Sequence, residues 1–406
     1  MSKSLRVFKA SFLLGSTLLC ATALSAQFAY EGDVTPTPPT SGELFDTATI
    51  AIGQNANGAL TVSGTHTITC DTLQMGGVGN GTLALNNSAS MSGKSLIVGN
   101  SGASSTLTFS STSGASFSSI TVGSASGASG HLVMESNNYV RGSTLTVSSS
   151  LGGAGKVTVN NGTLSLFSLN IGYSAAATGS VTMNGGTISV TFLSLSSATG
   201  TGKLVVNSGS FKTVGVQFGQ GNGQIEINGG AFSSSSAVSL NSAQNALFKV
   251  TGGTVSLGST LSLGVSGNGE LYISGGRTTV GGQLGVSQHG KLTFAIDSAN
   301  LPNSSEALLS ANSLVLDAAG TFIIDLNNIS DPLDTSFLLL EVTQDVSQDI
   351  KNIVWDIIGI TGAEGSAYTQ WVGNSLFLHV NVIPEPACTA MLAGLLGLCV
   401  AARRRK

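Results

Sequence analysis

Charged, aromatic and cysteine residues are all scarce in this chain of 406 residues. Charged side chains make up 9% of it and aromatic side chains 6%, and the net charge is −4. Such a charge supplies no basic patch, so we expect no nucleic-acid partner. Of the four cysteines, only Cys70 lies outside the terminal apolar segments, and a lone cysteine forms no internal disulfide. The body must therefore be held by packing and backbone hydrogen bonds, with Cys70 as a small buried apolar residue.

Acidic residues are scarce in the middle of the chain, where an enzyme of this kind would need them. No Asp occurs between Thr82 and Phe294, and the Glu residues there, Glu135, Glu226 and Glu270, fall at different phases of the repeat described below. Polysaccharide cleavage needs clustered carboxylates, either to bind a cation or to act as acid and base. The four histidines have no metal-ligand spacing, and no nucleophile elbow or phosphate loop occurs. We expect no catalytic site, no metal site and no cofactor.

Glycine, by contrast, is abundant, and it separates two short patterns that repeat every 21–25 residues. Each pattern is an apolar-x-apolar triplet, followed by Asn, Ser, Thr or Gly. The first triplets start at Leu60, Leu83, Leu107, Leu132, Val157, Val181, Leu204, Ile225, Phe248, Leu271, Leu292 and Phe322. The second start at Ile50, Leu73, Leu96, Ile120, Leu145, Leu169, Leu193, Val216, Val238, Leu261, Leu284 and, after a longer gap, Leu314.

The alternation within each triplet predicts a short β-strand, and the glycine-rich links predict turns that need positive φ. One such unit cannot bury its apolar face alone, so the units must stack into a parallel β-solenoid. About eleven coils at ~4.8 Å each give a rod on the order of 50 Å long. Triplets such as Leu164–Leu166 and Val255–Leu257 predict a third face in some coils. Four asparagines that share one phase predict an amide ladder at one corner: Asn160, Asn184, Asn207 and Asn228.

The domain order follows from the composition on either side of the repeat. Residues 1–26 are typical of a signal peptide, with Lys3, Arg6 and Lys9 before an apolar stretch and a small-residue cleavage site. Residues 27–45 are predicted to be a Pro/Thr linker, residues 46–324 the solenoid and residues 325–381 a β-rich cap over its exposed end. Residues 382–406 form a separate tail.

The cap region is more charged and more aromatic than the repeat. Trp355 and Trp371 are predicted to pack there, and stacking of sugars on them is the alternative. The cap carboxylates are interpreted as solvated, with a cation site as the alternative. Within the repeat, Glu270 and Lys291 lie one coil apart at the same phase, which predicts a surface ion pair that contributes little to stability.

The repeat body resembles the passenger-type β-helix repeats of exported bacterial proteins. Leu271-Tyr-Ile-Ser-Gly-Gly276, followed by Leu284-Gly-Val286, carries the likeness, which covers about two thirds of the chain. Its motifs are degenerate, so the likeness implies a fold and a class of exported protein rather than one activity.

The tail contains three features in order: Pro384-Glu385-Pro386, the apolar stretch Ala387–Ala402, and the cluster Arg403-Arg404-Arg405. As a helix the apolar stretch would measure about 24 Å, short for a hydrocarbon core of ~30 Å. The following positive charges would stay on the cytoplasmic side. The precursor should therefore be exported and held in the membrane by a short transmembrane helix.

This tail resembles a PEP-CTERM sorting signal, a module also catalogued as an ice-binding protein C-terminal region. The resemblance implies an exosortase-type membrane protease as partner, in Gram-negative bacteria that make exopolysaccharide. It assigns recognition to Pro384, Glu385 and Pro386, and membrane retention to Arg403, Arg404 and Arg405.

These features favour a non-enzymatic exported protein of the cell surface or extracellular matrix, with exopolysaccharide as a further partner. Two alternatives stay open. One is a polysaccharide-active β-helix enzyme with its site in the cap. The other is an adhesin that binds carbohydrate or ice; Thr65-His-Thr-Ile-Thr69 is the one stretch that approaches the Thr-x-Thr pattern expected of an ice-binding face.

Overall fold

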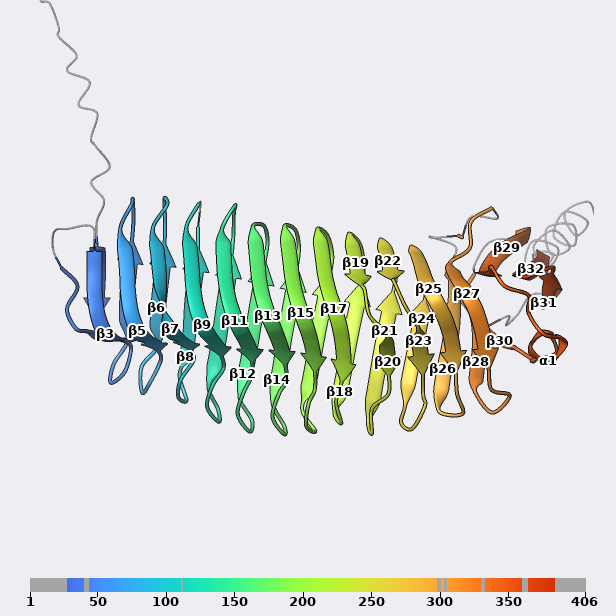
Figure 1. Cartoon of the computed structure of the whole chain (residues 1–406), viewed down its shortest axis with the longest axis horizontal. Helices are drawn as coiled ribbons and strands as arrows, with labels where there is room; N and C mark the ends of the chain where they lie inside the picture. The colour runs from blue at the N-terminus through green and yellow to red at the C-terminus, as the bar shows by residue number, and fades with distance from the viewer. Residues whose placement is uncertain are drawn as a thin grey trace, which may run out of the picture.

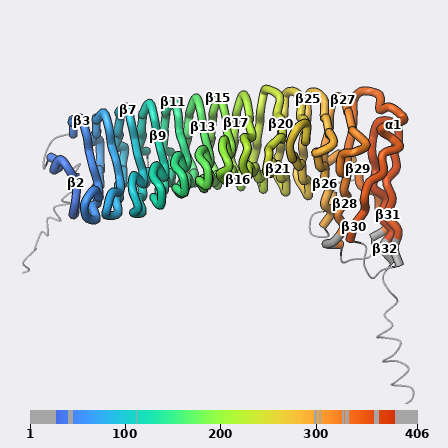
Figure 2. The backbone as a smooth tube through the Cα atoms, turned by 90° about the horizontal axis from the view of Figure 1, so that it is seen from below, coloured from blue at the N-terminus to red at the C-terminus, as the bar shows by residue number. Residues whose placement is uncertain are grey.

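The molecule is a β-solenoid whose coils follow one another along a single rod (Figures 1 and 2). The computed structural model describes residues 28–39, 44–110, 112–297, 301–302, 305–329, 333–359 and 364–383. Two sheets run the length of the rod, and we call them sheet A and sheet B. Apart from the terminal strands, neighbouring strands in both sheets pair in parallel, as the repeat predicts.

Sheet A contains 14 strands. They are β1 (Phe28–Gly32), β4 (Gly58–Val62), β6 (Gly81–Leu85), β8 (Ser104–Phe109), β10 (Ser129–Met134), β12 (Ala154–Val159), β14 (Thr178–Met183), β16 (Thr201–Val206), β18 (Asn222–Ile227), β21 (Asn245–Val250), β24 (Gly269–Ile273), β26 (Gly290–Asp297), β28 (Thr321–Asn328) and β30 (Asp356–Ile358).

Sheet B contains the other strands, and one short helix, α1 (Gln348–Lys351), lies near the C-terminal end. The strands are β2 (Val34–Thr35), β3 (Leu44–Ile52), β5 (Thr67–Met75), β7 (Ser90–Val98), β9 (Gly114–Val122), β11 (Tyr139–Val147), β13 (Thr163–Ile171), β15 (Thr187–Leu195), β17 (Ser210–Phe218), β19 (Ala231–Ser234), β20 (Val238–Leu240), β22 (Thr254–Leu257), β23 (Leu261–Leu263), β25 (Arg277–Val286), β27 (Leu309–Leu316), β29 (Leu333–Val342), β31 (Glu364–Val372) and β32 (Ser375–Ile383).

The strand register matches the sequence repeat residue for residue. In sheet A each first-triplet residue pairs with its equivalent in the next coil, from Leu60 with Leu83 through to Leu292 with Phe322. In sheet B the second column pairs in the same way, from Ile50 with Leu73 through to Leu284 with Leu314. A one-residue slip would turn every apolar side chain outward, and this fixes the register.

The third predicted face belongs to sheet B rather than to a sheet of its own. In β13, Leu164 and Leu166 point inward, Phe167 is exposed, and the inward alternation resumes at Leu169. The strand bends at Phe167, and in later coils the bend separates two strands, such as β19 and β20. Each coil therefore contributes three apolar segments to the core, but from two sheets.

The turn that follows each of four consecutive strands of sheet A is stabilised by the predicted asparagine ladder. Asn184 Nδ2 donates to Asn160 Oδ1 at 2.8 Å, and Asn207 and Asn228 continue the chain of bonds at 2.8 and 2.9 Å. The Glu135 carboxylate accepts from Asn160 at one end, and the Thr251 hydroxyl donates to Asn228 at the other. Two residues after each ladder asparagine, and after Thr251, stands a glycine with positive φ: Gly162, Gly186, Gly209, Gly230 and Gly253.

The N-terminal end differs from the predicted linker. Residues 28–35 form two strands: β1 pairs antiparallel with β4, and β2 pairs antiparallel with β3. The side chain of Phe28 is buried, with its ring 5.9 Å from Phe45 and 4.6 Å from His66. The linker prediction was wrong here because these residues lack the repeat but still cover the first coil, whose strand edge and apolar end would otherwise face water.

The C-terminal end is a β-rich cap with one difference in boundary. β28 and β30 continue the parallel pairing of sheet A beyond residue 324, whereas β29, β31 and β32 form antiparallel pairs in sheet B. Trp355 is buried against Phe294 and Phe322, with ring centroids 5.7 and 5.4 Å away, so it closes the core and offers no surface for sugar stacking. Trp371 is half-buried on β31 and packs against the core.

The predicted signal peptide lies outside the described residues, as does the tail from Pro384 onward. Within the ranges that the structure does describe, no helix has the length and apolar character needed to cross a membrane.

Candidate functional site

The outer surface of sheet B carries columns of hydroxyl side chains. Outward positions two residues apart bear Thr or Ser in several coils: Thr67 and Thr69, Ser90 and Ser92, Thr163 and Ser165, Thr187 and Ser189, and Thr254 and Ser256. The columns extend well beyond the Thr65–Thr69 stretch recognised from the sequence, since the other coils have serine at one or both of the two positions. Tyr139 and Arg141 on β11 interrupt them.

Four large aromatic side chains gather on this surface in three consecutive coils. Tyr139 on β11 is 49% exposed, Phe167 on β13 is 58% exposed and Phe192 on β15 is 49% exposed. Tyr173, in the turn after β13, is 50% exposed. The rings of Phe167 and Phe192 meet edge to face at 5.3 Å and an interplanar angle of 78°. In a chain so poor in aromatic residues, this group is a local concentration that core packing does not explain.

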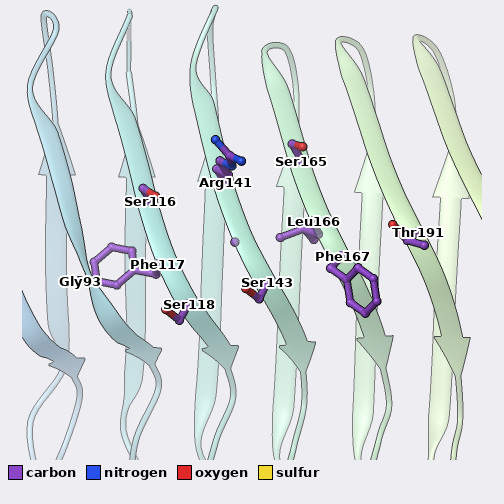
Figure 3. A pocket seen from close by; sticks show the side chains of 11 residues that line it. Gly93, Ser116, Phe117, Ser118, Arg141, Ser143, Ser165, Leu166, Phe167 and Thr191 are labelled. Atoms are coloured by element: carbon purple, nitrogen blue, oxygen red, sulfur yellow. The ribbon is translucent and has the colours of Figure 1, made fainter.

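Three adjoining hollows surround these aromatic side chains. The first, of about 350 Å³, lies between β7 and β11 and is lined by Ser92, Tyr139 and Arg141. The second, of about 440 Å³, shares Ser116 and Arg141 with the first and reaches Phe167 and Thr191 (Figure 3). The third, of about 520 Å³, shares Phe167 with the second and includes Tyr173, Phe192, Asn170 and Gln217. We call the three together the outer groove.

Glycines at the bend of sheet B shape this groove. A Cβ at Gly93 would clash with the carbonyl oxygen of Cys70 and would lie 2.7 Å from the buried ring of Phe117, which comes from the next coil (Figure 3). On the outer side of the sheet, the exposed ring of Phe192 lies beside Gly215, where an added Cβ would be 3.5 Å from it. The aromatic side chains therefore cover the missing side chains of their neighbours, as aromatic residues do beside strand glycines elsewhere.

Between β7 and β25, the charged side chains on the strands of sheet B are all positive. The strands of sheet B from β7 to β25 contain Lys94, Arg141, Lys212 and Arg277 and no carboxylate. Lys94 pairs with Asp71 at 2.8 Å, and Arg277 approaches Glu306 at 3.9 Å. Arg141 and Lys212 form no ion pair with any described carboxylate.

Arg141 and Lys212 also stand on one line along the rod. They occupy the same outward column, three coils apart, through Ser165 and Ser189. At ~4.8 Å per coil the separation of their backbones is about 14 Å.

The structure keeps the carboxylates of the solenoid apart. Glu270 pairs with Lys291 at 3.0 Å, as predicted, and Glu226 pairs with Lys203 at 2.9 Å. Both pairs lie on the outer side of sheet A, away from the outer groove. Among the described residues, no three His, Cys, Asp or Glu side chains come together in a way that could hold a metal ion.

The remaining titratable candidates are structural. Cys70 is buried, as predicted, and burial, with a smaller contribution from Asp71 and Asp46, raises the pKa of its thiol to about 11. Partial burial, followed by the charge of Lys156, lowers the pKa of His131, whose Nε2 lies 3.0 Å from the Thr158 hydroxyl. Neither residue lines the outer groove.

Pro384, Glu385, Pro386, Arg403, Arg404 and Arg405 lie outside the described residues, so no geometry connects them to the groove. The outer groove was not predicted from the sequence. A signal was present, since Tyr139, Arg141 and Phe192 stand at positions where the neighbouring coils on both sides have Gly, Ser or Thr. The chain matches no family model, no curated protein and no solved structure.

Proposed function

We propose that this chain is a non-enzymatic exported protein of the cell surface or extracellular matrix, sorted and processed at Pro384-Glu385-Pro386 by an exosortase-type membrane protease. The observation that carries the proposal is the order of the three features in the sequence: Pro384-Glu385-Pro386, then the apolar stretch, then the arginine cluster. Among the described residues, the strand nearest to this motif is β32, which reaches Ile383, the residue directly before Pro384. Cleavage beside Pro384 would therefore separate the whole β-solenoid from the apolar tail without cutting a strand.

The architecture supports a structural role. Every coil is bonded to the next through both sheets, and antiparallel strands cover the two ends of the rod. A rod built in this way presents a long, rigid and mainly uncharged surface, which suits display outside the cell.

The test is a size and fractionation comparison in the native host. Replacing Glu385 with Ala should leave export and membrane insertion intact and block processing, so that a longer membrane-bound form accumulates. Neutral residues in place of Arg403, Arg404 and Arg405 should instead weaken retention of the tail, because positive charges oppose its translocation. A Glu385→Ala protein that matures and is released like the wild type would contradict the proposed sorting.

A further inference from the structure

We infer that the outer groove is a binding site for a linear anionic polysaccharide. Its floor is a hydroxyl-rich parallel sheet, its exposed rings are Tyr139, Phe167 and Phe192, and its unpaired cation is Arg141. This inference is independent of how the tail is processed.

The aromatic side chains supply the stacking surface. A pyranose ring has an apolar face of C–H groups that packs on an aromatic ring, while its hydroxyl groups need hydrogen-bond partners around the rim. Phe167 and Phe192 are each about half exposed, and their edge-to-face pairing fixes both rings without hiding them. Ser116, Thr191, Asn170 and Gln217 line the same hollows and offer donors and acceptors at the rim.

The dimensions favour a linear polymer over a small ligand. The three hollows share lining residues, so they form one path from β7 on one side to Ala237, next to β20, on the other. These residues belong to seven successive coils, which span about 29 Å at ~4.8 Å per coil. That path is long enough for several sugar rings in a row.

The charge pattern selects an acidic chain. Arg141 lies where the first two hollows meet, and Lys212 continues its column about 14 Å further along the rod at ~4.8 Å per coil. No carboxylate occurs on the strands of sheet B between β7 and β25, and Asp71 on the adjoining β5 is paired with Lys94. A guanidinium group binds a sugar carboxylate through two parallel hydrogen bonds, which a neutral sugar cannot match.

The experiment measures binding of the purified full chain, kept in mild detergent, to immobilised alginate and to neutral dextran. We expect binding to alginate that weakens as salt is added, and much weaker binding to dextran. Phe167→Ala should weaken alginate binding at least about tenfold. Arg141→Gln should weaken it about three- to fivefold at low salt, with the difference fading near ~1 M salt.

Two matched variants serve as controls. Tyr30→Ala removes an aromatic ring of similar exposure from β1 of sheet A, and Lys156→Gln removes an exposed cation from β12. Both should bind alginate like the wild type, and far-UV circular dichroism should be the same for all four variants.

Equal binding to dextran and alginate would overturn the anionic assignment, and loss of binding in the controls as large as in Phe167→Ala would overturn the site. Thermal hysteresis without alginate binding would assign the hydroxyl columns to ice and refute the inference. Since every measurement uses purified protein, failure here leaves the processing experiment in the host unaffected.

Discussion

At the residue scale, two adjacent residues of β18 test how much more an inward position contributes to stability than an outward one. Ile227 is fully buried and stacks in register between Val206 and Val250, whereas Glu226 faces outward and pairs with Lys203. Ile227→Asp should cost several kcal/mol, because an unpaired charge would be buried among apolar side chains. Glu226→Ala should cost no more than about 1 kcal/mol. Urea unfolding followed by circular dichroism measures both, and equal losses would disprove the assigned alternation.

Cys70 allows a second residue-scale prediction, in a full chain whose other three cysteines are replaced by serine. Because the pKa of the buried thiol is raised to about 11, very little of it is thiolate at pH 8. Its reaction with a disulfide reagent should therefore be at least ~100-fold slower in the folded than in the unfolded protein. The neutral thiol favours the folded state fully below ~pH 8.5, and this contribution is lost as the pH rises toward 11. Equal reaction rates in urea and in buffer would show that Cys70 is accessible.

At the element scale, the turn after the asparagine ladder depends on its glycines. Gly230 has φ +68°, and an added Cβ would lie 2.5 Å from the carbonyl oxygen of Gly209 in the coil below. Gly230→Ala combines a left-handed conformation, at about 1–2 kcal/mol, with overpacking, at about 1–3 kcal/mol. We expect a loss of about 2–5 kcal/mol in the free energy of unfolding.

Gly285, in β25, is the matched control for that turn. Its nearest atoms to an added Cβ are 3.9 Å away, and its φ is not in the left-handed region. Gly285→Ala should be neutral or stabilising by about 0.4–1 kcal/mol. Similar destabilisation in both variants, measured by the same urea unfolding, would mean that close stacking of the turns is not what requires glycine at Gly230.

Also at this scale, the sequence predicted the strands of the repeat far better than it predicted the ends of the rod or its outer surface. Two apolar columns with one period determine which residues pair between coils. The triplets from Leu60 to Phe322 could therefore be aligned with one another without a structure. β1 could not be predicted, since Phe28–Gly32 belongs to no repeat and pairs antiparallel. Nor could the outer groove, because it is formed by outward side chains of several coils, whose contacts with one another the repeat pattern does not give.

At the scale of the whole molecule, the rod combines a uniform core with an uneven surface. The two inward columns of the repeat triplets remain apolar from coil to coil, because each side chain must fit above and below its equivalents. The outward columns are free of this requirement, and it is there that Tyr139, Arg141, Phe167 and Phe192 depart from Ser and Thr. In a solenoid, a departure from the repeat at outward positions is therefore the place to look for function.

At the two ends of the rod, strand edges would be open to association with other chains if nothing covered them. β1 covers the edge of β4, and Phe28 covers Phe45 and His66 in the first coil. Deleting residues 28–39 from the full chain should leave the coils folded, since each is held by its neighbours, but should expose a strand edge and an apolar end. We therefore expect dimers or larger species by light scattering after size exclusion, with the β circular dichroism retained. Glu31→Ala, an exposed change on β1 itself, should leave the association state of the wild type unchanged. If the deletion variant showed the same mass as the wild type at the same concentration, β1 would not be what keeps the rods apart.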